Sequence, residues 1–246
     1  MLSDIEAELE REIRALRNEL VRERRARELR AEIARLAAAT SARVDRPGVG
    51  QVLSDGAVDI FESAFALVAW VDDEAVVHLV GSTNGTGRLD NPAWSQLRLD
   101  ADLPVCEVLR GDRPLIEIHD PSAMFPWRPL RELCDEAGIE AMVVGRIGNG
   151  DQPDAALILT WTEPRTLDMA ASEHLDLFAS LAAPAFERAR RTESDDELSR
   201  AVQTWLREGR LADVDRLEIA TLYEPGRDLM QVGGDWFDVV ELGNDR

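Results

Sequence analysis

Residues 141–162 read AMVVGRIGNGDQPDAALILTWT. Two runs rich in apolar and β-branched residues, Ala141–Ile147 and Ala155–Thr162, flank the turn-forming Gly148-Asn149-Gly150. Runs of this kind on either side of a glycine-containing turn are typical of two antiparallel strands. The segment therefore predicts a β-hairpin.

Similar segments precede this hairpin. Residues 64–71 (AFALVAWV) and 75–82 (AVVHLVGS) predict another hairpin across the turn Asp72-Asp73-Glu74, and residues 115–118 predict a short single strand. Helices are predicted over residues 52–63, 103–110 and 130–137, and a long helix is predicted to begin at Asp168. This order predicts an α+β fold in which one antiparallel sheet has its helices to one side.

The long C-terminal helix contains Pro184, which removes one backbone hydrogen bond, so a kink or a break is expected there. Beyond the proline, residues 191–212 are predicted to form a linker helix, because Leu198, Val202 and Trp205 continue a helical stripe.

The first 36 residues follow a different pattern. Residues 2–36 contain no Gly or Pro and consist mainly of strong helix formers. Apolar residues recur along one stripe at Leu2, Ile5, Leu9, Ile13, Leu16, Leu20, Leu29, Ile33 and Leu36. A stripe this narrow predicts a coiled coil over residues 1–40, with a homodimer as its partner, and residues 40–50 predict the linker that ends it.

The arginine-rich segment 22–30 is either a patch for nucleic acid or membrane, or a solvated face. The interleaved acids nearly cancel its charge and favour the solvated face. Across all 246 residues, 28 basic and 48 acidic side chains give a net charge of −20, which argues against a nucleic-acid-binding protein. No run approaches the ~20 apolar residues of a membrane span, and no leader follows Met1. We therefore expect a cytoplasmic protein with no membrane partner.

The order of elements from residue 52 to residue 190 resembles a GAF domain, a small sensor and dimerisation module. Residues 105–118 (VCEVLRGDRPLIEI) are similar to the stretch in which GAF domains place a short helix, a turn with glycine and proline, and a strand. Residues 141–167, a hairpin closed by Glu163-Pro164-Arg165, are similar to the last strand pair of that family. The resemblance implies a GAF-like sensor domain over residues 48–190.

The sharpest chemical motif is VGGDWFDV at residues 232–239, which follows Tyr223-Glu224-Pro225. Gly233 and Gly234 allow a tight turn that projects Asp235, and hard divalent cations prefer carboxylate ligands of this kind. The motif resembles the opening of the PPM-type, SpoIIE-like serine phosphatases of bacteria. Residues 198–211 look like the helix that joins a GAF sensor to that phosphatase, although this chain has Leu206-Arg207-Glu208 where the family usually has Leu-Pro.

In that family, two Mn²⁺ or Mg²⁺ ions activate a water that attacks a phosphoserine. The resemblance implies that Asp235 is a ligand of the metal pair and that Asp238 is either another ligand or a residue that supports the site from outside. The family's substrates are phosphoserines on anti-sigma-factor antagonists. The implied role of this chain is regulatory: the helix over residues 168–211 passes a signal to the phosphatase, and the homodimer forms through residues 1–40 and that helix.

Residues 213–246 are too few for a phosphatase domain, since about 34 residues make only two or three strands. We expect them to be the N-terminal fragment of such a domain, without a complete catalytic site, tight metal binding or activity of their own. The alternative interpretation is a standalone dimeric GAF sensor or scaffold with no catalytic activity.

The remaining candidates favour packing over chemistry. Cys106 and Cys134 lack Cys-x-x-Cys spacing and are expected to be buried thiols. The three isolated histidines are expected to pack in the core or lie on the surface rather than bind metal: His78, His119 and His174. Four tryptophans either line a ligand pocket or belong to the core: Trp70, Trp94, Trp127 and Trp161.

Overall fold

The computed structural model describes residues 2–83, 97–124, 126–148 and 153–207. The chain divides into two compact units, residues 1–189 and 190–246, and the first contains the sheet. Residues 213–246, with the predicted phosphatase motif, lie outside the described residues. No helix among the described residues is both long enough and apolar enough to cross a membrane.

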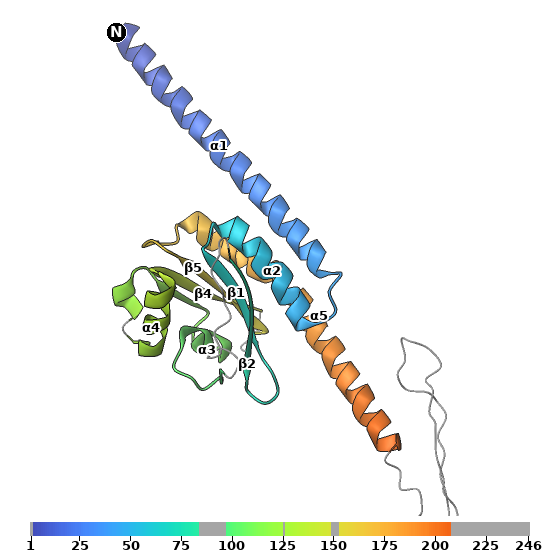
Figure 1. Cartoon of the computed structure of the whole chain (residues 1–246). Helices are drawn as coiled ribbons and strands as arrows, with labels where there is room; N and C mark the ends of the chain where they lie inside the picture. Colours follow the sequence, from blue (N-terminus) through green and yellow to red (C-terminus); the bar gives the residue numbers. More distant parts are fainter. Residues whose placement is uncertain (1, 84–96, 125, 149–152, 208–246) are drawn as a thin grey trace, which may run out of the picture. The chain divides into compact units, whose positions relative to one another are not determined.

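One antiparallel sheet of five strands forms the centre of the first unit (Figure 1). Its strands are β1 (Phe65–Val71), β2 (Val77–Thr83), β3 (Leu115–Ile118), β4 (Ala141–Ile147) and β5 (Ala155–Trp161), in the spatial order β2-β1-β5-β4-β3. Both predicted hairpins are confirmed, as β1 with β2 and β4 with β5. Strand β5 also pairs with β1, where Phe65 lies opposite Thr160, so the last of the described strands is the central one.

Helices cover both faces of the sheet (Figure 1). On one face lie α1 (Leu2–Thr40), α2 (Arg46–Phe61) and α5 (Met169–Arg207). On the other lie α3 (Pro104–Leu109), the 3₁₀ turn Pro121–Met124 and α4 (Arg128–Ala137). The prediction of helices to one side is wrong. All seven residues of β5 are buried, and its sequence AALILTW is almost wholly apolar, so both of its faces need cover.

The face that carries α1, α2 and α5 is closely packed. Phe178 and Phe186 of α5 are buried against Leu157 and Leu159 of β5 in the first hydrophobic core. Two glycines bring backbones together here. A Cβ on Gly50 of α2 would lie 2.6 Å from Val80 Cγ2, and one on Gly145 of β4 would lie 3.3 Å from Leu175 Cδ2. This face therefore has little space for larger side chains.

Helix α2 begins earlier than the sequence predicts. Residues 46–50, predicted as part of a linker, form its first turns. The Asp45 carboxylate accepts a hydrogen bond from the Gly48 amide at 3.0 Å and caps the helix, and Pro47 lies in the first turn, where the missing N–H costs nothing. Pro and Gly thus mark a helix start here rather than a longer loop.

Helix α1 has two parts with different surroundings. Leu29, Ile33 and Leu36 pack against the first core, and Ile33 is 1% exposed. Near the N-terminus, three apolar residues of the predicted stripe are 43%, 54% and 66% exposed: Ile13, Leu16 and Leu20. At 100° per residue these two sets are offset by roughly 165° around the helix. The predicted single stripe is therefore split, because its last three residues pack within their own domain.

Helix α5 continues through Pro184, and the helix is not broken there. Buried neighbours on both sides of the proline hold the segment against the first core: Ala182, Ala183, Ala185 and Phe186. The Arg188 guanidinium also donates to the backbone oxygen of Thr40 at the end of α1, at 3.1 Å. The segments predicted separately on either side of the proline thus belong to one helix.

The contact of Gly50 with Val80 is testable by complementary substitutions. Gly50→Ala should lower the free energy of unfolding by about 1–3 kcal/mol, because the new methyl group overpacks the α2–sheet contact. Val80→Ala removes the opposing methyl groups, so the double variant should show a favourable coupling of about 1 kcal/mol in a double-mutant cycle. Urea unfolding measures all three variants. Strict additivity would show that the contact does not limit packing.

Candidate functional site

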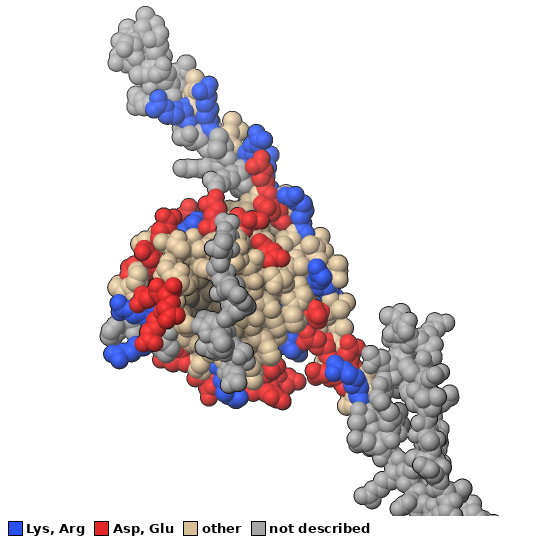
Figure 2. All heavy atoms as spheres, viewed as in Figure 1, with Lys and Arg blue, Asp and Glu red and all other residues tan. Residues whose placement is uncertain are grey.

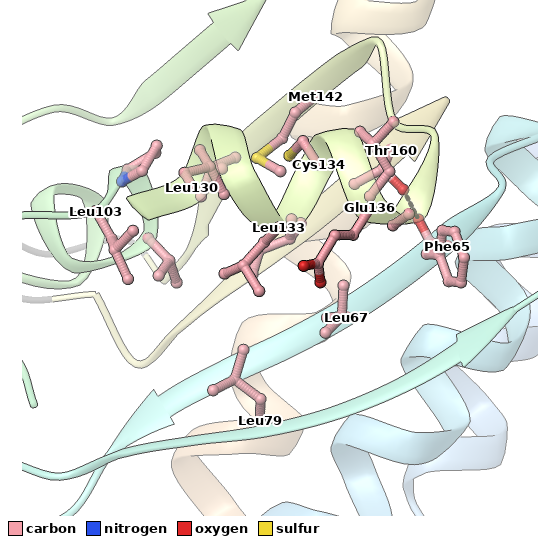
Figure 3. A pocket seen from close by; sticks show the side chains of 16 residues that line it. Phe65, Leu67, Leu79, Leu103, Leu130, Leu133, Cys134, Glu136, Met142 and Thr160 are labelled. Carbon is pink, nitrogen blue, oxygen red and sulfur yellow. Dashed lines mark hydrogen bonds between the residues drawn. The ribbon is translucent and has the colours of Figure 1, made fainter. Parts of the chain in front are cut away.

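A cavity of about 440 Å³ lies in the second hydrophobic core, between the sheet and helices α3 and α4 (Figure 3). The sheet contributes side chains from four strands, among them Leu67, Leu79, Met142, Val144, Ile158 and Thr160. Helix α4 contributes Leu130, Leu133, Cys134 and Glu136 from the opposite side. The volume falls within the range of about 300–1,000 Å³ that is usual for small-molecule sites.

The position of the cavity follows from the alternation of side chains along the central strands. Leu67 and Ile158 point to the cavity, whereas their neighbours Val68 and Leu157 belong to the first core. The same strands thus line a closely packed core on one face and an incompletely filled one on the other. A single layer of sheet backbone therefore separates the cavity from the first core.

Few polar groups meet in this cavity. The Thr160 hydroxyl is directed to the backbone oxygen of Phe65, to which it donates at 3.4 Å. The Cys134 thiol of α4 also lines the cavity, and the exposed Glu136 carries the one charge among the described lining residues. In Figure 3 the Glu136 carboxylate points away from α4, toward the space between Leu133 and Leu67. The chemistry on offer is a large apolar surface with one carboxylate.

Both cysteines are free and buried, as the sequence predicts. Burial raises the pKa of the Cys106 thiol to about 11, although Arg110 opposes the shift, and burial likewise raises the pKa of Cys134 to about 11. Each thiol therefore stays protonated at neutral pH. A protonated thiol is a poor nucleophile and a poor metal ligand.

The histidines do not assemble a metal site. His78 Nε2 lies 2.7 Å from Asp72 Oδ2, and the His78 ring stacks on Trp70 with 5.7 Å between centroids. Partial burial raises the pKa of Asp72, but hydrogen bonds from His78 and from the Val76 and Glu74 amides outweigh it, so the pKa lies below its ordinary value. Asp72 thus stabilises the β1–β2 turn. No three His, Cys, Asp or Glu residues gather as possible metal ligands in the described part of the chain.

Trp70, Trp127 and Trp161 belong to the cores and do not line the cavity. Trp70 and Trp161 lie in the first core, and Trp161 Nε1 donates to the Phe61 backbone oxygen at 3.3 Å. Trp127, in the second core, donates to Glu107 Oε1 at 2.9 Å and so connects the start of α4 with α3. Trp94 lies outside the described residues.

The lining residues of α4 were not anticipated as a site. Leu130, Leu133, Cys134 and Ala137 repeat at helical spacing, which from sequence indicates only a face turned to a core. The predicted metal-site residues lie outside the described residues: Gly233, Gly234, Asp235 and Asp238.

Acidic residues outnumber basic residues in this chain. Figure 2 shows acidic side chains spread over the domain and arginine side chains along α1. The chain as a whole carries a net charge of −20. An anionic ligand would therefore approach a surface of like charge.

The raised thiol pKa values predict that both cysteines react slowly with disulfide reagents. At pH 8 a disulfide reagent should react with both thiols of the folded protein at least ~100-fold more slowly than with the unfolded chain, because a pKa two units higher leaves ~100-fold less thiolate. Stopped-flow absorbance with the variants Cys106→Ser and Cys134→Ser assigns each rate. A native thiol that reacts as fast as the unfolded chain would contradict its burial.

Comparison with known proteins identifies the fold. No protein-family profile and no curated protein matches the sequence. Three solved structures are similar at 11% identity. The GAF domain of an Acinetobacter phosphoenolpyruvate-protein phosphotransferase has a TM-score of 0.52, and the match covers 68% of this chain and 98% of that one. Free methionine-R-sulfoxide reductase from Neisseria meningitidis has a TM-score of 0.52 with 68% and 92% of the two chains covered, and the chromophore-binding domain of a bacteriophytochrome from R. palustris has a TM-score of 0.50 with 67% and 63% covered. The described domain has a GAF-like fold.

Proposed function

We propose that this chain is a sensor, in which the cavity binds a small apolar molecule and the helices on the opposite face of the sheet pass the signal on. The observation that carries the proposal is the cavity itself, about 440 Å³ and lined mostly by aliphatic side chains. Two structures of similar fold support a ligand site: one is a chromophore-binding domain, and the other is an enzyme in complex with its substrate.

The sheet offers a route for the signal. Thr160 and Ile158 line the cavity, and between them Leu159 is buried in the first core with Phe178 and Phe186 of α5. A ligand that changes the position of β5 changes the packing of α5. Such a ligand shifts the equilibrium only by the difference between its affinities for the two arrangements.

Binding to the cavity can be tested with 1-adamantanol, a compact neutral probe. The folded protein should bind it with a dissociation constant of about 1 mM or tighter, corresponding to roughly −4 kcal/mol. Leu133→Trp places a large ring in the cavity and should weaken binding at least ~10-fold, whereas Glu132→Trp places the same ring on the exposed side of α4. Amide NMR titration measures both. No binding by the folded wild type, or an equal loss in both variants, would contradict the proposal.

The proposed sensor is a homodimer through the N-terminal half of α1. Ile13, Leu16 and Leu20 form an exposed apolar stripe, which a parallel copy of the helix would cover. Leu29, Ile33 and Leu36 already pack within the domain, so the surface offered to a partner lies N-terminal to them. The proposed dimer interface also includes α5.

Two variants with the same change in net charge test the dimer. Leu16→Glu with Leu20→Glu should weaken dimerisation at least ~100-fold, since each buried leucine is worth about 1.5–3 kcal/mol. Arg14→Glu also changes the net charge by −2 but lies off the apolar stripe, and it should leave the dimer largely intact. Sedimentation equilibrium gives the dissociation constants. A monomeric wild type, or a double variant as dimeric as Arg14→Glu, would exclude this interface.

The proposed output is a metal-dependent protein serine phosphatase that acts on phosphoserines of anti-sigma-factor antagonists. Its support is the sequence VGGDWFDV at residues 232–239, in which Asp235 would bind one or both of two Mn²⁺ or Mg²⁺ ions. The competing interpretation, a dimeric scaffold without catalysis, makes the opposite prediction for the same residue.

Asp235 distinguishes these interpretations. In the natural polypeptide that carries this sequence, Mn²⁺ should stimulate phosphate release from a phosphoserine protein, and Asp235→Asn should reduce it at least ~100-fold, because a lost metal ligand removes the activated water. Asp245→Asn, the same chemical change outside the motif, should have little effect. A colorimetric phosphate assay suffices. Absence of Mn²⁺-dependent release from the folded wild type would support the scaffold.

A further inference from the structure

The described lining of the cavity contains one acidic side chain and no basic one. None of the described lining residues is an arginine, a lysine or a histidine. The Thr160 hydroxyl already donates its hydrogen to the Phe65 backbone oxygen, and the protonated Cys134 thiol is a weak donor. A phosphate or carboxylate group against these described lining residues would lose hydration without gaining a strong partner from their side chains.

A cation meets a different environment at one end of the cavity. Glu136 is exposed, so its carboxylate is hydrated when the cavity is empty, and no hydrogen bond or ion pair joins it to another described residue. Arg131 of the same helix pairs with Asp135 instead, with 3.9 Å between Nε and Oδ2. The Glu136 carboxylate is thus free to pair with a ligand.

The end of α4 reinforces this preference. The helix ends at Ala137, and Gly138 caps it in the left-handed conformation at φ 66°. Its last carbonyl groups carry the partial negative charge of a helix C-terminus, which stabilises a nearby cation. Glu136 and Ala137 both line the cavity, so the last turn of α4 forms part of its wall.

We infer that the cavity takes an apolar molecule that carries a protonated amine, with the hydrocarbon body between sheet and helices and the ammonium group paired with Glu136 at the end of α4 (Figure 3). The inference rests on the proposed function of the cavity as a ligand site. It adds the chemical class of the ligand, and it predicts that ligands with a phosphate or carboxylate group bind to the described lining more weakly than amines do.

Three adamantane derivatives of nearly the same shape provide the test: 1-adamantylammonium, 1-adamantanol and 1-adamantanecarboxylate. Calorimetry at pH 7 and low salt should give an ammonium affinity at least ~3-fold above that of the alcohol and a carboxylate affinity at least ~10-fold below it. The ammonium preference should shrink as NaCl is raised to 0.5 M.

Glu136→Gln keeps the shape of the side chain and removes its charge. It should lower the ammonium affinity about 3–10-fold and leave the alcohol affinity within ~2-fold. Glu132→Gln removes a charge from the exposed side of the same helix and should leave the preference in place. Circular dichroism confirms that each variant is folded.

The outcomes distinguish a wrong ligand class from a cavity that binds no ligand. If the alcohol binds in the cavity but the ammonium binds no better, or keeps its advantage in Glu136→Gln, the inference is wrong while the cavity remains a ligand site. If none of the three probes binds to the folded protein, the proposed function itself is wrong, and the inference fails with it.

Discussion

Burial of strand β5 along its whole length is the constraint on which the domain depends. The strand pairs with β1 and β4 and exposes none of its seven residues. Because its side chains alternate between the faces of the sheet, burial requires a layer of helices on each side. Helices α1, α2 and α5 supply one layer, and helices α3 and α4 between β2 and β4 supply the other.

The two layers differ in how they meet the sheet. Glycines at 50 and 145 allow close approach on the side of α1, α2 and α5, and paired aromatic rings fill the space, such as Phe61 with Phe178 at 5.7 Å between centroids. The short helices α3 and α4 leave a cavity on the other side. A domain built this way holds a firm connection to its helical extensions on one face and space for a ligand on the other.

The sequence was sufficient for the strands and for their pairing into two hairpins, because runs such as ALVAWV and AALILTW are bounded by clear turns. The sequence did not correctly predict the helical layers. AALILTW lacks the alternation of apolar and polar residues that is typical of a sheet covered on one face, yet helices were predicted on one side only. The split of α1 also depends on tertiary contact, since Leu29 and Leu16 are equally apolar in sequence. The cavity could not be foreseen, because helical spacing in α4 indicates a core face whether or not that core is filled.

The difference between the two faces can be measured directly on adjacent residues of β4. Val143 is buried in the first core, and Val144 lines the cavity. Val143→Phe should lower the free energy of unfolding by about 1–3 kcal/mol or more, because the first core has no room for the ring, whereas Val144→Phe should cost at least ~1 kcal/mol less, because its ring enters the cavity. Chemical denaturation of the two variants gives both values. Equal losses would show that the second core is as full as the first and would contradict the account.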